Sequence, residues 1–406
     1  MTFRPLTAIT AVFSPYRLVL DSPQRRAFVA AAWAGRFPKS ALGLGLILLI
    51  ALTEGDYALA GTVSAAFVVA LAIGGPRWSR AMDIFGVRRV LPITAALLSV
   101  FAVLLLVAIS TDAPVWTWFV LAVLTGLSVV DMGSVVRSRW ASILEQDERL
   151  PAFALESIND ELVFVVSPPI VTLLATLVDP VLGFVVGLVV GLGGYLAFAW
   201  GSSASRSERP TQRGAAVPAG ILGVVVAFGA MGVVFGGFDI SAVALAEQAG
   251  VPVAAGLLIG VFALASVISG TILGARPVVR SRARRFVVAA IAYSILVPLL
   301  ALSSDIVFAA AACAAAGVVT SPLMITGIAL VEHRAEASRL TETLAYPTAA
   351  IAVGGMLGAW LSGHVIESAG AQAGFLVPAV AAATVVVTVT VSEALVARAA
   401  AFRPPE

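Results

Sequence analysis

Three carboxylates occur within six residues of a strongly apolar region, in the stretch ALESINDELVFVVSPP (154–169). They are Glu156, Asp160 and Glu161. Insertion scales give a cost of about 2.5–3.5 kcal/mol for one charged side chain at the bilayer centre, so three could approach about 10 kcal/mol. Such groups must therefore be paired with cations, carry protons or face water. A carboxylate that gains and loses a proton inside a membrane is typical of proton-relay sites.

Helical geometry divides these three acids between two faces. At 3.6 residues per turn, Glu156 and Asp160 lie about 40° apart, whereas Glu161 points about 100° away from Asp160. Glu161 shares its side with Ser157 and Pro168. The sequence therefore predicts one pair of acids and one separate acid.

Two apolar segments meet in a hairpin whose tip lies at residues 144–146, and this suggests partners for the acids. Counted from the tip, Arg137 reaches the depth of Glu156, so the two are a candidate ion pair and a static latch. Asp131 reaches the depth of Asp160, and two acids at one level favour one that keeps its proton. That property suits a proton-coupled carrier, so we expect functional roles for Asp160 and Glu161.

Two cations interrupt the first apolar segment. They are Arg36 and Lys39, and Lys39 is the only lysine in the chain. If the span begins near Ala27, Lys39 lies mid-membrane; if it begins near Trp33, both cations can snorkel to the surface. Pro38 between them predicts a bend.

A further acid, Asp239, stands in the segment VVFGGFDISAVAL beside three glycines. We interpret it as a gate or coupling acid. The alternative is an acid that reaches the water outside.

These residues belong to a chain of membrane-spanning helices. Of its 406 residues, 60% are hydrophobic and 12% are charged, which is about half the charge of a soluble domain, and the mean hydropathy is +1.02. Apolar runs of 20 or more residues recur, which indicates helices. A β-barrel would show alternating segments of about ten residues.

We count twelve apolar segments, and a polar stretch after the sixth separates two sets of six. The predicted organisation is an N-terminal six-helix half at 1–200, a cytoplasmic linker at 201–216 and a C-terminal six-helix half at 217–406. Copies with the same orientation would be related by an axis along the membrane normal, with a cavity between them. The segments are 27–52, 57–80, 90–110, 114–139, 151–178, 180–201, 217–246, 252–275, 286–303, 306–331, 341–366 and 372–396.

Basic residues orient these segments. Of the 25 Lys and Arg residues, all except Arg36 and Lys39 lie at the two termini or near connectors that follow even-numbered segments. The positive-inside rule then places both termini and the linker in the cytoplasm. We expect a multi-pass protein of the cell's inner (plasma) membrane, with Arg137 and Glu156 near its cytoplasmic side.

The connector SRAMDIFGVRRVL (79–91), together with the twelve spans, resembles a motif of the major facilitator superfamily. Asp83, Gly86, Arg88 and Arg89 match the pattern, whereas Ser79 stands where a glycine is usual. Ile84 likewise replaces an arginine. The resemblance implies an all-α fold of two six-helix halves and a cytoplasmic gate at this loop.

Other stretches resemble actinobacterial members of the superfamily whose substrates are mostly unassigned. They are AGRFPKSALGLGLILL (34–49), VVRSRWASIL (135–144), ALESINDELVFVVSPP (154–169), FGGFDISAVALAEQAG (235–250) and RLTETLAY (339–346). The resemblance implies that segments one, four, seven and ten line the cavity. Arg36 and Lys39 would then neutralise acids on segments four and five, or hold an anionic substrate.

The prolines of the opening stretch depart from this family. Many of its antiporters carry a Gly-Pro pair with further glycines on segment five. Ser167, Pro168 and Pro169 occupy that place here. An antiporter assignment therefore stays open.

Several classes of protein are disfavoured. The chain has no phosphate-binding loop, metal-ligand spacing, nucleophile elbow or cysteine pair, so we expect no enzyme, cofactor or metal. Its basic residues follow the topology and form no nucleic-acid patch.

We predict a secondary active transporter that works by alternating access, is coupled to protons and exports small amphipathic molecules. Its partners would be a small-molecule substrate, protons and the lipid bilayer, and the protein would be a monomer. The alternatives are a uniporter or importer with structural buried charges, and a sensor or scaffold that transports nothing. The predicted coupling and cavity residues are Asp131, Glu156, Asp160, Glu161, Asp239, Arg36 and Lys39; the predicted gate residues are Asp83, Gly86, Arg88, Arg89 and Arg137.

Overall fold

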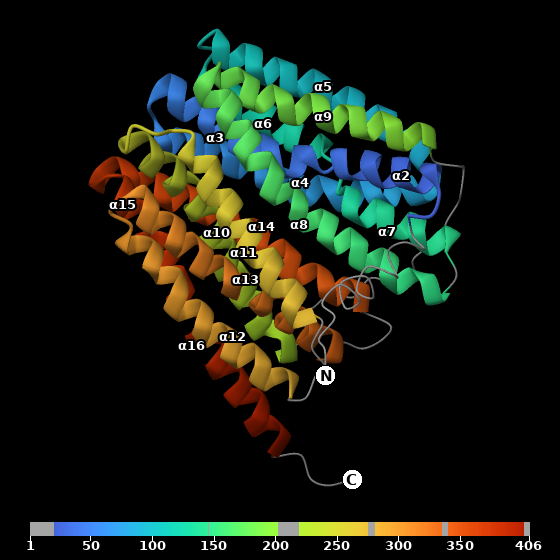
Figure 1. The fold of residues 1–406 in the computed structure, drawn as a ribbon, viewed down its shortest axis with the longest axis vertical. Helices are drawn as coiled ribbons and strands as arrows, with labels where there is room; N and C mark the ends of the chain where they lie inside the picture. Colours follow the sequence, from blue (N-terminus) through green and yellow to red (C-terminus); the bar gives the residue numbers. More distant parts are fainter. Residues whose placement is uncertain (1–19, 145, 202–218, 275–280, 335–339, 402–406) are drawn as a thin grey trace, which may run out of the picture.

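The computed structural model describes residues 20–144, 146–201, 219–274, 281–334 and 340–401 (Figure 1). In these ranges the regular secondary structure is helical, and twelve helical stretches are long and apolar enough to cross a membrane. The predicted all-α fold with twelve spans is confirmed. The predicted linker at 201–216 lies outside the described residues, apart from Gly201.

The first six spans form what we call the N-terminal bundle. Its helices are α2 (Pro23–Ala34), α3 (Phe37–Glu54), α4 (Tyr57–Phe85), α5 (Val87–Ser110), α6 (Val115–Ser128), α7 (Met132–Ile143), α8 (Gln146–Leu177) and α9 (Pro180–Gly201). Two of these spans consist of two helices each, α2 with α3 and α6 with α7.

The last six spans form the C-terminal bundle. Its helices are α10 (Leu222–Gln248), α11 (Ala254–Gly274), α12 (Arg282–Leu296), α13 (Ile306–Arg334), α14 (Leu340–Ala369), α15 (Ala371–Gly374) and α16 (Leu376–Ala401), with the 3₁₀ turns η1 (Ala219–Ile221) and η2 (Val297–Leu302).

The first span bends where the sequence predicts. Its helix is interrupted at Gly35 and Arg36, and α3 begins at Phe37 with Pro38 in its first turn. Proline is tolerated there because the first-turn N–H groups have no partner within the helix. The break places the Arg36 side chain inside the bundle, where it is 3% exposed.

The fourth span lies at Val115–Trp140, where the apolar segment 114–139 was predicted, and it is also interrupted. Residues 129–131 leave the helical conformation between α6 and α7. The Tyr195 hydroxyl accepts the Val130 N–H at 2.9 Å and donates to the Val130 carbonyl at 3.3 Å. The Trp78 indole N–H donates to the Leu127 carbonyl at 2.6 Å. These side chains satisfy backbone groups that would otherwise be costly inside a membrane.

The fifth span, in contrast, runs through its two prolines as the single helix α8. Pro168 and Pro169 lie directly against Gly256 of α11, so they form part of the contact between the two bundles. The glycine that allows this approach is in the partner helix α11, not in α8.

The bundles contact each other through α4 with α14 and through α8 with α11. Tyr57 donates a hydrogen bond to the Glu247 carboxylate, and the Ala58 N–H donates to Glu367 at 2.8 Å. Gly61 approaches the Ala359 carbonyl so closely that a Cβ atom would not fit. Glu367 is in the last turn of α14, directly before α15, so these contacts lie at the end of the molecule that carries α15 (Figure 1).

Candidate functional site

Arg36 joins the first span to the fifth. Its Nη2 lies 2.5 Å from Glu156 Oε2, and its Nε lies 2.6 Å from Asp160 Oδ1. The second oxygen of Glu156, which is 0% exposed, accepts the Trp140 indole N–H at 2.9 Å. Both oxygens of this buried carboxylate therefore have donors, which is the condition for keeping a charge in an apolar interior.

Arg137 contacts the other carboxylate of the pair. Its Nη2 lies 2.5 Å from Asp160 Oδ2, and both side chains are 36% exposed. The predicted Arg137–Glu156 pair is thus replaced by Arg137–Asp160, because Arg36 arrives from the first span and occupies Glu156. One turn of helix separates the two acids, a distance that the long Arg137 side chain can span.

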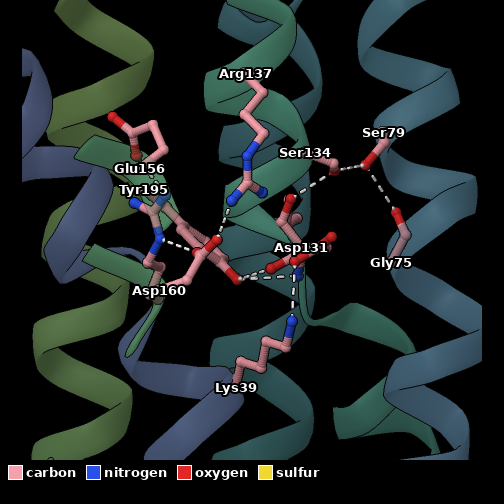
Figure 2. A network of polar contacts seen from close by, with 11 residues as sticks. Lys39, Gly75, Ser79, Asp131, Ser134, Arg137, Glu156, Asp160 and Tyr195 are labelled. Atoms are coloured by element: carbon pink, nitrogen blue, oxygen red, sulfur yellow. Dashed lines mark hydrogen bonds and ion pairs between the residues drawn. The ribbon is translucent and has the colours of Figure 1, made fainter. Parts of the chain in front are cut away.

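Lys39 neutralises Asp131 at the break in the fourth span. Lys39 Nζ lies 3.2 Å from Asp131 Oδ1, and the side chains are 45% and 38% exposed. Asp131 is the residue that precedes α7, where a helix N-terminus favours a negative charge. Asp131 and Asp160 were expected as two acids that share a proton, but each has its own cation (Figure 2).

A chain of hydroxyl groups extends from this site to the fourth and second spans. The hydroxyls of Ser79 and Ser134 lie 2.8 Å apart, and each bonds a backbone carbonyl, of Gly75 and Asp131 respectively (Figure 2). Ser79 is the residue that replaces the usual glycine of the family motif. The sequence shows that a serine replaces the glycine, but it does not show that the serine hydroxyl contacts Ser134.

Sequence reasoning also missed two aromatic residues of the site. Trp140 binds Glu156, and Tyr195 supports the break beside Asp131. Trp140 follows Arg137 by three residues, and this helical spacing could have indicated that both side chains lie on the same face of α7. The sequence gives no comparable signal for Tyr195.

Glu161 and Asp239 stand apart from the paired charges. Both are half-buried within membrane spans, and neither has a hydrogen bond or ion pair to another residue in the described ranges. Glu161 follows Asp160 on another face of α8, as predicted. Asp239 lies on α10 of the C-terminal bundle, and the structure does not join it to the other acids.

The predicted gate loop forms a tight turn between α4 and α5. Gly86 has φ +87°, which glycine adopts without strain, and its N–H donates to the Met82 carbonyl at 2.8 Å. Arg88 and Arg89 are exposed in the first turn of α5. The Asp83 side chain lies outside the described part of the structure.

The charges of the N-terminal bundle form what we call the ionic layer. Three cations, Arg36, Lys39 and Arg137, face Asp131, Glu156 and Asp160, and Glu161 adds a fourth acid. Part of the layer is exposed, so its groups can exchange partners with water, protons or solutes. Charged groups at this depth are typical of proteins that move solutes or protons across membranes.

Two bundles of six spans that pack against each other are the architecture of many secondary transporters. The chain belongs to the Major Facilitator Superfamily, whose family model matches residues 28–315. It is a transporter of that superfamily by family and fold.

Solved structures of transporters have the same fold. The nucleoside transporter NupG is 12% identical, with a TM-score of 0.70, and the match covers 92% of this chain and 99% of that one. The POT family transporter PepTSo is 13% identical, with a TM-score of 0.69 and coverage of 94% and 99%. A bacterial homolog to the human lysosomal transporter Spinster is 12% identical, with a TM-score of 0.64 and coverage of 92% and 96%. No curated protein matches the chain in sequence.

Proposed function

We propose that this protein is a proton-coupled secondary transporter that exports small amphipathic molecules by alternating access, as a monomer in the cell's inner membrane. One observation carries the proposal. Glu161 is a half-buried carboxylate of the ionic layer, inside a span, and no cation in the described ranges pairs with it. The three other acids of that layer have cationic partners.

The pairing supports Glu161 as the coupling acid over its neighbours. A nearby cation favours the ionised form of a carboxylate. Asp160 has two such cations, Arg36 and Arg137, and Asp131 has Lys39. Glu161 can take up a proton without breaking an ion pair. It is therefore the acid that can gain and lose a proton at the lowest cost in free energy.

The positive-inside pattern supports an inward-facing arrangement. With both termini cytoplasmic, the end at which Tyr57 and Ala58 contact the acids of α10 and α14 is the outer one. The bundles are then closed toward the outside, and the exposed part of the ionic layer faces the cytoplasm. Alternating access requires these outer contacts to break in the opposite state.

The direction and substrate class rest on resemblance to superfamily members, including the actinobacterial group. The nucleoside and peptide transporters with the same fold are only 12–13% identical to this chain, so they indicate no substrate. An amphipathic solute is consistent with charged side chains set among apolar ones.

A second candidate is a uniporter or importer whose buried charges are structural. The ion pairs that join Arg36 to Glu156 and Asp160 favour it, because a cluster in which each charge has an opposite partner can serve as a latch alone. Under that reading Glu161 would have no part in coupling.

Transport in liposomes separates the two candidates. A ligand identified by thermal shift would be loaded into vesicles with a pH gradient across the membrane, because a ligand of the folded state raises its apparent stability. We expect the gradient to drive counterflow in the wild type and not in Glu161→Gln, whose exchange of ligand without a gradient should persist.

Two further variants complete the test. Glu332→Gln changes an exposed acid near the end of α13 and should behave as the wild type. Asp160→Asn removes the partner of two arginines and should lower the stability as well as transport. Gradient-driven counterflow at the wild-type rate in Glu161→Gln would refute the coupling role and favour the structural reading.

A further inference from the structure

Three buried N–H groups at the crossing of the first and fifth spans lack a hydrogen-bond acceptor in the described ranges. They are Trp33 Nε1, Arg36 Nη1 and Asn159 Nδ2, and we call them the donor cluster. Arg36 is 3% exposed and Asn159 is 8% exposed. Buried polar groups nearly always have partners, so unpartnered donors on facing helices require an explanation.

The three donors belong to adjoining turns of the two spans. Arg36 binds Glu156 and Asp160, and Asn159 lies on the same turn of α8. The Trp33 ring packs edge-on against Phe37 with 5.2 Å between ring centroids. Trp33, Phe37 and Val163, which follows Asn159 by one turn, belong to the large apolar core that extends into both bundles. Arg36 directly precedes α3, which packs against α8, the helix that carries Asn159.

The chemistry of the cluster selects an acceptor. All three groups are N–H donors, and both carboxylates near Arg36 are already occupied by its Nε and Nη2. A ligand atom that completes the cluster must therefore bring lone pairs, as a carbonyl oxygen does.

The charge of the ionic layer further limits the class of ligand that can carry this acceptor atom. The three cations Arg36, Lys39 and Arg137 are matched by the three acids Asp131, Glu156 and Asp160, so no net positive charge is left to hold an additional anion. An uncharged acceptor needs no such charge. The rings of Trp33 and Phe37 offer an apolar surface to the rest of such a molecule.

We propose that the donor cluster binds an uncharged carbonyl or amide oxygen of the transported molecule, whose apolar part lies against Trp33 and Phe37. This inference rests on the proposed transport function, and it assigns the substrate class. Because the cluster is enclosed in the present arrangement, binding requires the first and fifth spans to separate slightly at this level.

Binding of matched naphthalene probes tests the proposal. N,N-dimethyl-1-naphthamide carries a carbonyl oxygen and no N–H, 1-naphthoate carries an anion, and 1-isopropylnaphthalene carries no acceptor. Each Kd would be obtained from the dependence of the thermal midpoint on probe concentration, at constant pH and without a gradient. The wild type should bind the amide more tightly than the other two probes.

Two variants remove single donors and preserve shape. Trp33→Phe keeps an aromatic ring, and Asn159→Leu keeps the side-chain volume. Each should raise the Kd of the amide probe about three- to tenfold, the loss of affinity expected for one hydrogen bond to a neutral acceptor. Without a probe, both variants should unfold at the wild-type temperature or above it, because each removes a buried unpartnered donor.

Ser40→Ala is the matched control on the same two spans. The Ser40 hydroxyl is buried and bonds the Ser167 hydroxyl at 2.7 Å, so its loss should lower the thermal midpoint and leave the amide Kd unchanged. If both donor variants bind the amide as the wild type does, the donors are satisfied by buried water only and the proposal is wrong.

The proposal for the donor cluster is equally wrong if the wild type binds no probe, or binds the amide no better than the naphthoate. Because no gradient is applied, these results do not depend on whether Glu161 couples protons. A failure of coupling and a failure of the donor cluster are therefore separate outcomes.

Discussion

Arg36 and Glu156 form a buried ion pair within the N-terminal bundle, so removing either side chain alone should destabilise the protein. Arg36 is the shared partner of Glu156 and Asp160, whose second oxygens bind Trp140 and Arg137. Replacing a buried pair by apolar residues is often neutral, whereas removing one member leaves an uncompensated charge.

Arg36→Leu should therefore destabilise the folded protein by about 3–5 kcal/mol, the range for a broken buried ion pair. The double variant Arg36→Leu with Glu156→Leu should recover part of the loss, because no buried charge is then left at Glu156. Reversible unfolding in detergent with added denaturant would measure both free energies. Equal losses in the single and double variants would contradict the electrostatic explanation.

Trp140 offers a milder test of the same carboxylate. Trp140→Phe removes the N–H that reaches Glu156 Oε1 and retains an aromatic ring in the buried site. The expected loss is about 1.5–3 kcal/mol, the range for hydrogen bonds to charged groups. Combined with Glu156→Gln, the Trp140→Phe change should cost less than it does alone, which a double-mutant cycle would measure.

Two breaks in helical spans place the charges of the ionic layer. Arg36 lies at the break between α2 and α3, and Asp131 lies at the break between α6 and α7. Irregular backbone at membrane depth needs partners from the protein. At the second break, Tyr195 bonds both backbone groups of Val130, and Trp78 bonds the Leu127 carbonyl.

Tyr195→Phe should leave the Val130 N–H unsatisfied and cost about 1–3 kcal/mol. It should also accelerate amide hydrogen exchange around residues 128–132, because the break loses its support. Tyr293→Phe is the matched control, since the Tyr293 hydroxyl is buried and has no partner in the described ranges. Its removal should be neutral or stabilising, and equal destabilisation by both variants would contradict the role of Tyr195.

The breaks also show how far the sequence predicts the site. Pro38 marks the first break locally, and the angular spacing of Glu156, Asp160 and Glu161 follows from helix geometry alone. The second break contains no proline or glycine that would mark it in the sequence. The hydroxyl that stabilises it belongs to a residue 65 positions away. The ion pairs of Arg36 likewise cross 120 and 124 positions, so that no local pattern could assign them.

The two bundles meet at one end through contacts that must open if access alternates. Tyr57 binds Glu247, and the Ala58 N–H binds Glu367, so two acids of the C-terminal bundle hold the start of α4. If access alternates, these hydrogen bonds break in the opposite state. Their loss should therefore change the balance of states and leave the fold unchanged.

Tyr57→Phe combined with Glu367→Ala should shift this balance toward the opposite state by about two- to fivefold, since exposed hydrogen bonds contribute little each. Spin-label distances would report it in a Cys313→Ala background, because Cys313 is the only cysteine. Labels at the exposed residues Trp116 and Val307 should move apart, and labels at Phe85 and Leu395 should approach.

Glu54→Ala provides the control for this experiment, because it removes an exposed acid at the same end of the molecule. Its distance distributions should match those of the wild type. Unchanged distributions in the double variant would show that the hydrogen bonds around Tyr57 do not hold the bundles together.

The wide sequence separation of the ion pairs has a consequence for biosynthesis. Arg36 and Lys39 leave the ribosome before their partners, which follow 92, 120 and 124 residues later. At about 5–20 residues per second, these cations wait about 5–25 s for their acids. An unpaired cation in the bilayer is costly. We therefore expect the span that carries Arg36 and Lys39 to stay at the insertion machinery until the span of α8 arrives, so that it enters the bilayer later than its place in the sequence suggests.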